Sequence, residues 1–124
     1  MALTVLVVDD DIDVRSSCAE VLRTADYVVQ EAADGFAAIE HLRSGNIGAV
    51  LLDLNMPGLD GLSLLDEFDQ LPPVALLTER EYDPEVISRR EKVFMFLSKP
   101  VPPPDLLEAV SHMLSAGHVE GSAV

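Results

Sequence analysis

A chain of 124 residues is the size of one ordinary domain, and a hydrophobic content of 48% indicates a folded core rather than a disordered chain. The formal net charge of -14 argues against nucleic-acid phosphates and anionic membrane surfaces as direct partners, because both are bound through clustered Lys and Arg. No apolar run is long enough to span a membrane, and the amino-terminal residues lack the pattern of a signal peptide. We therefore expect a cytoplasmic protein that attracts cations or basic partners.

Five short apolar runs follow one another along the chain, at residues 3–8, 27–32, 49–54, 74–78 and 93–98. Their starts lie about 19 to 25 residues apart, which is the length of one strand plus one helix. Most of the runs are continuously apolar rather than alternating, a pattern typical of strands covered on both faces. The runs therefore predict a parallel sheet.

The segments between these runs have helical periodicity. Residues 11–25 place several apolar side chains on one face, with Asp11 or Asp13 as the N-cap, and the members of this face are Val14, Cys18, Val21, Leu22 and Ala25. Further helices are predicted at residues 35–43, 61–68 and 104–114, and a short, mostly polar one at 84–91. Cys18, the single cysteine, is interpreted as a core residue, and it rules out an intrachain disulfide.

Alternating strands and helices predict a three-layer, doubly wound α/β sandwich, because right-handed crossovers place helices on both faces of one parallel sheet. Five units indicate a flavodoxin-like (βα)5 fold whose five-stranded parallel sheet has the order 2-1-3-4-5. We expect one domain over residues 1–116, followed by a C-terminal tail or a truncated linker at 117–124. In this sheet order, ligands bind beyond the carboxyl ends of strands one and three.

Polar residues stand at the carboxyl ends of four of the five predicted strands. Asp9 and Asp10 follow the first strand, Asp53 lies in the third, Thr78 ends the fourth, and Lys99 follows the fifth. The predicted topology brings these ends together in one cleft. Clustered carboxylates without Cys or His suit a hard divalent cation, and a site that keeps several waters suits Mg²⁺.

Carboxylates with a bound Mg²⁺, beside a lysine and a threonine, can also hold a phosphoryl group. The sequence has no Gly-rich phosphate loop of the Walker type, so a bound nucleotide is not expected. We therefore expect the phosphoryl group to become attached to the protein, with Asp53 as the nucleophile.

Four motifs together resemble the receiver domain of bacterial two-component response regulators, including the chemotaxis regulators. They are "VVDDD" at residues 7–11, "LLDLNMPGLDG" at 51–61, "LLT" at 76–78 and "FLSKP" at 96–100, and they cover nearly the whole chain in the family's order and spacing. The resemblance implies a phosphorylation-activated signalling switch that is not an enzyme with an external substrate. Its partner would be a sensor histidine kinase or a phosphotransfer protein.

The resemblance also implies roles in the cleft. Asp53 matches the phosphoacceptor, Asp10 a direct Mg²⁺ ligand and Asp9 the carboxylate that acts beside it. Asn55 matches the position whose backbone carbonyl completes the metal shell.

Other positions match the switch of the family. Thr78 corresponds to the hydroxyl that moves toward the phosphoryl oxygens, and Phe96 to the aromatic side chain that moves with it. Lys99 corresponds to the lysine that contacts the phosphoryl group, and the bond between Lys99 and Pro100 to one that is cis in the family. The face formed by the fourth helix, fifth strand and fifth helix would then control an output domain, an effector or a homodimer.

The sequence departs from the family pattern in two places. Glu79 follows the switch threonine where the family commonly has a small residue, and Asn55 and Arg80 occupy positions that tune the lifetime of the aspartyl phosphate. Residues 91–93 replace the usual Gly-Ala pair before the fifth strand. We therefore expect the phosphorylation rate and the signalling face of this chain to differ from those of other family members.

Other functions call for features that the sequence lacks. An Mg²⁺-dependent aspartyl phosphatase would usually have a second acid where Asn55 stands, and it would need a substrate cap. A flavin-binding protein would need a loop rich in Ser, Thr and Gly after the first strand. His41, His112 and His118 lie on separate segments and do not indicate a zinc site. An adaptor that works without phosphorylation stays open.

Overall fold

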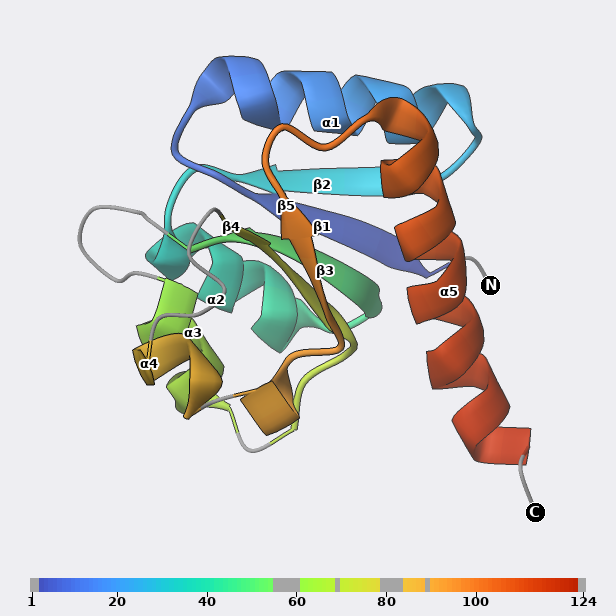
Figure 1. Cartoon of the computed structure of the whole chain (residues 1–124). Coiled ribbons are helices and arrows are strands. Elements are labelled where there is room, and N and C mark those ends of the chain that lie inside the picture. Colours follow the sequence, from blue (N-terminus) through green and yellow to red (C-terminus); the bar gives the residue numbers. More distant parts are fainter. Residues whose placement is uncertain (1–2, 55–60, 69, 79–83, 89, 123–124) are drawn as a thin grey trace.

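The computed structural model describes residues 3–54, 61–68, 70–78, 84–88 and 90–122. Five parallel strands form one sheet, and Figure 1 shows it between two layers of helices. The strands are β1 (Thr4–Val8), β2 (Val28–Ala32), β3 (Ile47–Asp53), β4 (Val74–Thr78) and β5 (Met95–Ser98). Their order, β2-β1-β3-β4-β5, confirms the predicted doubly wound, flavodoxin-like topology.

The helices follow the strands in the predicted alternation. They are α1 (Ile12–Thr24), α2 (Gly35–Ser44), α3 (Gly61–Glu67), α4 (Pro84–Ile87) and α5 (Pro103–Ser122), with a 3-10 turn, η1 (Arg90–Lys92), before β5. Among the helices in the described part of the chain, none has both the length and the apolar character needed to cross a membrane.

Two hydrophobic cores lie on opposite faces of the sheet, because successive side chains of a strand point to opposite sides. In β1, Val5 and Val7 pack with α1 and α5, whereas Leu6 and Val8 pack with α2 and α3. All four side chains are buried. This double coverage explains why the central strands are continuously apolar in sequence.

The ends of the first two helices are fixed by capping residues. Asp11 is the N-cap of α1, and its Oδ1 accepts hydrogen bonds from the backbone N–H groups of Asp13, at 2.9 Å, and Val14, at 3.3 Å. Of the two predicted caps, Asp11 is therefore the correct one, and Asp13 lies in the first turn. At the end of α2, Gly45 has a φ angle of +84°, which glycine adopts at little steric cost.

Three predicted elements differ from the observed ones. The helix predicted at 84–91 consists of α4 and η1, because a mostly polar segment offers few side chains that could bury against the sheet. Helix α5 extends to Ser122, beyond the predicted end at residue 114, since the apolar spacing used to place it stops at Leu114. Ala25 is an exposed C-cap rather than part of the buried face of α1.

Candidate functional site

The pairing of the strands brings the predicted site residues to one edge of the sheet. Val8 of β1 pairs with Leu52 of β3, so Asp9 and Asp53 follow side by side. Asp53 in turn pairs with Leu77 of β4, just before Thr78. Thr78 pairs with Ser98 of β5, the residue before Lys99. The carboxyl ends of four strands thus meet, as predicted.

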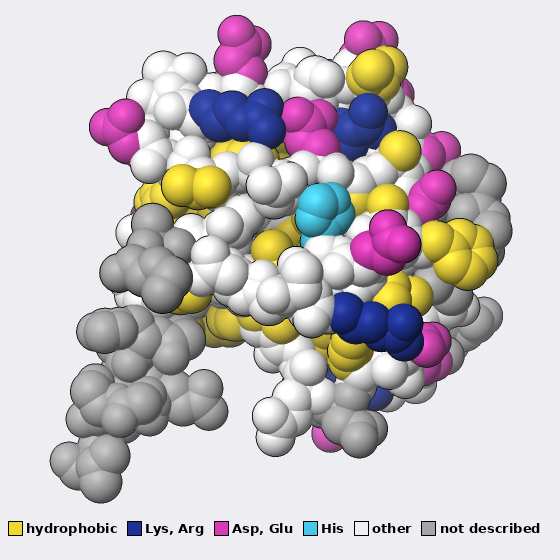
Figure 2. Space-filling model, turned by 180° about the vertical axis from the view of Figure 1, so that it is seen from behind, with side chains coloured by type: hydrophobic (Ala, Val, Ile, Leu, Met, Phe, Trp, Pro, Cys, Tyr) yellow, Lys and Arg dark blue, Asp and Glu magenta, His cyan; other side chains and the backbone are white. Residues whose placement is uncertain are grey.

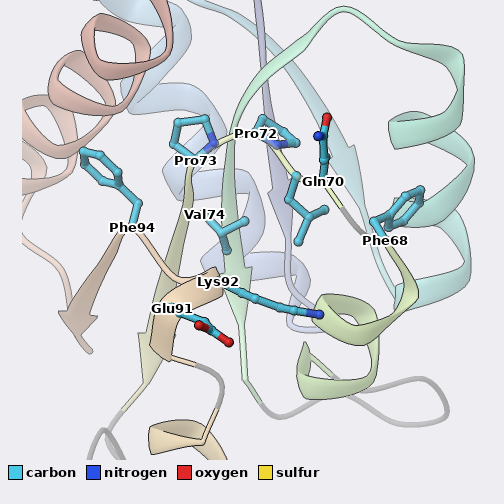
Figure 3. A pocket seen from close by; sticks show the side chains of 9 residues that line it. Phe68, Gln70, Pro72, Pro73, Val74, Glu91, Lys92 and Phe94 are labelled. Atoms are coloured by element: carbon cyan, nitrogen blue, oxygen red, sulfur yellow. The ribbon is translucent and has the colours of Figure 1, made fainter. Parts of the chain in front are cut away.

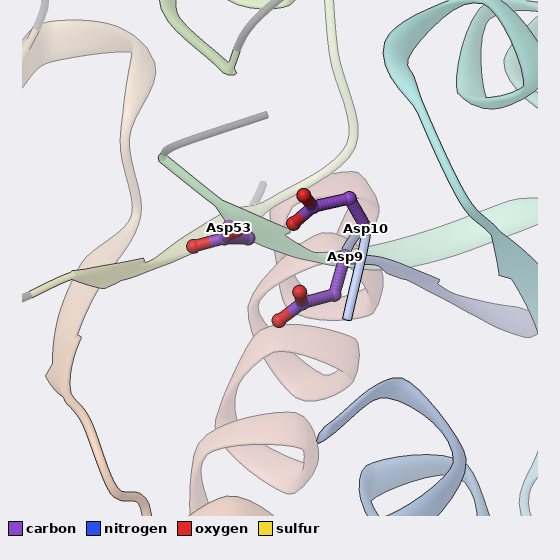
Figure 4. A group of neighbouring side chains, drawn as sticks. All are labelled: Asp9, Asp10 and Asp53. Carbon is purple, nitrogen blue, oxygen red and sulfur yellow. The ribbon is translucent and has the colours of Figure 1, made fainter. Parts of the chain in front are cut away.

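Three carboxylates converge at this edge, as Figure 4 shows. Asp9 and Asp53 are buried, with 2% and 5% of their surface exposed, whereas Asp10 is exposed. One carboxylate oxygen from each lies within 4.8 Å of those from the other two. Carboxylates this close repel one another unless a cation lies among them.

Lys99 supplies one positive charge to the cluster. Its Nζ donates a hydrogen bond to Asp53 Oδ1 at 2.7 Å and lies 3.4 Å from Asp9 Oδ2. Partial burial lowers the pKa of the ammonium, but the hydrogen bond to Asp53 and the charges of Asp53 and Asp9 outweigh this effect and raise the pKa above its ordinary value. Lys99 is therefore a fixed cation at physiological pH.

The first carboxylate of the cluster also shapes the backbone around it. Asp9 Oδ1 accepts a hydrogen bond from the backbone N–H of Asp11 at 2.9 Å. Arg15 Nη1 donates to the backbone carbonyl of Asp9 at 2.9 Å, while its Nε lies 3.2 Å from Glu31 Oε1. Arg15 could not be predicted from the sequence, because contacts of a long side chain with a backbone carbonyl leave no spacing pattern.

The donor set of the cluster fits Mg²⁺. Each of its three residues offers carboxylate oxygens, which are the hard ligands that this ion prefers, and the exposed position of Asp10 leaves room for water. Asn55, whose backbone carbonyl is a predicted further ligand, lies outside the described residues. So do Glu79 and Arg80, the other residues predicted to tune the reaction.

The two predicted switch residues differ in their surroundings. Thr78 is 3% exposed at the end of β4. Phe96 is half-buried and packs against the core on the α2 and α3 side of the sheet. The predicted cis peptide bond between Lys99 and Pro100 is present.

A groove of about 470 Å³ connects Lys99 with helix α1. Cys18 lines it beside Val14 and Val101. The sequence predicted Cys18 as a core residue, but its side chain is only half-buried. Burial, followed by the negative charge of Asp9, raises the pKa of the Cys18 thiol, although Lys99 opposes this rise.

A cavity of about 490 Å³ lies at the opposite edge of the sheet, at the amino ends of β4 and β5 (Figure 3). Lys92 of η1 lines it, and its Nζ donates a hydrogen bond to the backbone carbonyl of Leu65 in α3 at 3.2 Å. The same Nζ is 3.9 Å from Asp66 Oδ1. Lys92, one of the residues that replace the usual Gly-Ala pair, therefore connects η1 to α3.

The chain is also similar to known proteins over most of its length. The family model of the response regulator receiver domain matches residues 5–111. The transcriptional regulatory protein PrrA of Mycobacterium tuberculosis is 36% identical over 114 residues, which are 89% of this chain and 49% of PrrA. The phosphoglycerate transport system transcriptional regulatory protein PgtA of Salmonella typhimurium is 32% identical over 115 residues, 90% of this chain and 28% of PgtA. The chain thus spans half or less of the length of these two relatives.

Solved structures agree with this similarity. The crystal structure of a response regulator receiver domain protein (CheY-like) from Methanospirillum hungatei superposes with a TM-score of 0.83 at 30% sequence identity. The match covers 93% of this chain and 96% of that protein.

Proposed function

Because the chain belongs to the response regulator receiver domain family, whose members are phosphorylation-activated switches of two-component systems, we propose that Asp53 is its phosphoacceptor. The observation that carries the proposal is the position of Asp53 at the end of β3, buried, next to two further carboxylates and in contact with Lys99. Among the other aspartates of the described residues, only Asp9 is also buried.

The proposed reaction is an in-line phosphoryl transfer. A carboxylate oxygen of Asp53 attacks the phosphorus of a phosphohistidine, an O–P bond forms, and the P–N bond to the imidazole breaks. Small donors such as acetyl phosphate would react in the same way, with acetate leaving. Lys99 would bind a phosphoryl oxygen as negative charge builds up, since its ammonium already lies 2.7 Å from Asp53 Oδ1.

Asp9, Asp10 and Asp53 would hold Mg²⁺, with the backbone carbonyl of Asn55 as a further ligand. The ion, when bound, would neutralise the phosphoryl oxygens during transfer. Asp10 is suited to direct coordination because it is exposed, whereas Asp9 is buried and already contacts Lys99 and the backbone N–H of Asp11.

Phosphorylation would bias an equilibrium between two conformations rather than create a new one. The hydroxyl of Thr78 would move to a phosphoryl oxygen, and Phe96 would follow into the space released. Asn55, Glu79 and Arg80 would set the rates of phosphoryl transfer and loss. The affected surface is the face formed by α4, β5 and α5, which would bind an effector, an output domain or a second copy.

We further propose that the chain acts in the cytoplasm with a sensor histidine kinase or a phosphotransfer protein. It would catalyse only its own phosphorylation and dephosphorylation. Residues 1–116 would form the receiver, with residues 117–124 as a tail or linker.

Intact mass spectrometry tests the phosphoacceptor. The chain is incubated with acetyl phosphate, with and without Mg²⁺, as wild type, as Asp53→Asn and as the control Asp26→Asn. We expect one added phosphoryl group in the wild type and in the control, only with Mg²⁺, and none in Asp53→Asn. Unmodified protein after incubation with acetyl phosphate and with a panel of phosphorylated histidine kinases would favour the adaptor instead.

A further inference from the structure

A groove of about 490 Å³ lies between strand β5 and helix α5, which Figure 1 shows side by side. It is named the β5–α5 groove, and the residues that line it are Met95, Leu97, Asp105, Glu108, Ala109 and His112. The site described above lies beyond the end of β5, so the groove does not include its residues.

The groove has an apolar floor and an acidic rim. Met95 and Leu97 lie two residues apart on an edge strand, so they point to the same side, and both are only half-buried. Ala109 of α5 also lines the groove and is buried. Asp105 and Glu108 lie three residues apart, hence on one face of the helix, and both are exposed.

Neither Lys nor Arg on α5 balances this rim, and the basic side chain of α5 that lines the groove is His112. The sequence from residue 100 to 124 contains neither Lys nor Arg. Lys92, which precedes β5, is hydrogen-bonded to Leu65 in the other helix layer, and Lys99, which follows β5, contacts Asp53 and Asp9.

Charges elsewhere on the molecule are arranged differently. Figure 2 shows basic and acidic side chains next to one another on the opposite face of the molecule. Arg15 Nε and Arg23 Nη1, for example, each lie close to one oxygen of Glu31, at 3.2 and 3.1 Å. The rim of the β5–α5 groove is thus a place where acidic charge is available to a partner.

We propose that the β5–α5 groove binds a basic amphipathic segment of a partner protein. Apolar side chains of the segment would cover Met95 and Leu97, and its Lys or Arg side chains would lie beside Asp105 and Glu108. Helix-in-groove binding of this kind combines apolar anchors with charge complementarity, which fixes orientation and speeds association. The inference rests on the proposed function only in treating this face as the output surface.

A second copy of the chain is the occupant that the charges disfavour. A symmetric dimer through this groove would place the same patch of one copy against that of the other. Asp105 and Glu108 would then face Asp105 and Glu108 of the second copy, and like charges across an interface lower affinity.

A charge-swap experiment tests the proposal on the unphosphorylated chain. The probe is a peptide of Leu, Ala and Lys about four helical turns long with all Leu on one face, and its counterpart has Glu in place of Lys. Binding is measured by titration, and the amide shifts of residues 95–112 show where the peptide lies. Because the whole chain is acidic, Glu40→Lys/Glu67→Lys on α2 and α3 is the matched control for Asp105→Lys/Glu108→Lys.

We expect the Lys peptide to shift the amides of Met95, Leu97 and Ala109, and to bind about fivefold or more weakly to Asp105→Asn/Glu108→Gln. The Glu peptide should bind the variant Asp105→Lys/Glu108→Lys but not the control. If the Glu peptide bound Asp105→Lys/Glu108→Lys and the control Glu40→Lys/Glu67→Lys equally well, net charge alone would explain the attraction, and the proposal would be overturned. Dimerisation of the wild type through the same amides would also overturn it.

The same titration with Asp53→Asn separates this inference from the proposed function. Peptide binding that persists in this variant leaves the groove assignment intact even if no phosphoryl group is ever accepted. Conversely, phosphorylation of the wild type without peptide binding would leave the proposed function intact and overturn the groove assignment. Circular dichroism of each variant checks that α5 is still formed.

Discussion

Lys99 and Asp53 join the ends of β5 and β3, with 2.7 Å between the ammonium nitrogen and a carboxylate oxygen. Replacing the ammonium in Lys99→Met leaves Asp9 and Asp53 close together without this cation. We expect the free energy of unfolding to fall by about 1 to 2 kcal/mol in urea titrations without Mg²⁺, since a buried carboxylate loses its partner. Added Mg²⁺ should reduce the difference in the free energy of unfolding between the wild type and Lys99→Met. Equal stability of both proteins without Mg²⁺ would contradict this role.

The pH dependence of this contribution follows from the direction of the pKa shift. The pKa of Lys99 is raised above its ordinary value of 10.5, so the ammonium is charged in the folded and the unfolded state below that pH. The stabilisation should be constant from pH 6 to about 9 and be lost as the pH rises through the raised pKa. The free energies of unfolding of the wild type and Lys99→Met, measured by urea titration, should therefore differ by the same amount at each pH from 6 to about 9.

Asp10 and Asp11 are neighbours in sequence with separable roles. Asp10→Ala should weaken Mg²⁺ binding at least about tenfold, measured by calorimetry, because it removes a ligand from the exposed side of the cluster. Asp11→Ala should leave Mg²⁺ affinity almost unchanged but lower the free energy of unfolding by about 1 kcal/mol, since it removes the N-cap of α1. A loss of Mg²⁺ affinity of the same size in both variants would refute this division.

Gly48 is a position where the backbone comes close to other residues. A Cβ atom there would lie 2.6 Å from Leu3 Cβ and 2.8 Å from Leu114 Cδ2. Gly48→Ala should therefore lower the free energy of unfolding by about 1 to 3 kcal/mol, because the strand or α5 must shift. Gly45→Ala is the contrasting variant, since nothing lies within 4 Å of its Cβ but φ +84° with ψ −178° is a backbone conformation almost confined to glycine, so that it loses stability through backbone strain alone. Thermal unfolding of both variants distinguishes crowding from backbone strain.

Cys18 should react slowly in the native protein. Its raised pKa lowers the thiolate fraction at neutral pH, and its side chain is half-buried. Alkylation by iodoacetamide at pH 7.5 should be several times slower than in urea, and because the pKa of the thiol is raised, the native rate should go on rising with pH above the ordinary value of 9.0. A native rate equal to the unfolded rate would show that neither burial nor Asp9 acts on the thiol.

Lys92→Met tests the connection between η1 and α3. The variant keeps the length of the side chain but removes the hydrogen bond to the carbonyl of Leu65. We expect faster hydrogen exchange at residues 90–94 and a loss of about 0.5 to 1 kcal/mol of stability, as for one half-exposed hydrogen bond. Arg43→Met, an exposed change on α2, is the control and should not alter exchange at these residues.

The strand order and the meeting of Asp9, Asp53 and Lys99 could be predicted because both depend on patterns in the sequence. Continuous apolar runs identify buried parallel strands, and the topology then fixes which strand ends are neighbours. The burial of β1 and the pairing of Asp53 with Leu77 agree with this reasoning.

Contacts that depend on long, flexible side chains could not be predicted. Arg15 reaches the carbonyl of Asp9, and Lys92 reaches that of Leu65, across distances that no periodicity encodes. The end of α5 was also misplaced, since its last turns follow no apolar spacing that a pattern could detect. Element types were thus easier to predict than the ends of helices.

The alternation of the two cores along β1 also limits how the length of this chain can change. One residue inserted between Val5 and Val8 would exchange the side chains that face the two helix layers. It would also move Val8 into the position of Asp9 and Asp9 into that of Asp10, so that the cluster would lose its inward carboxylate at the same step. Insertions and deletions that natural variation can tolerate should therefore fall between the strands, while the interior of β1 keeps its length.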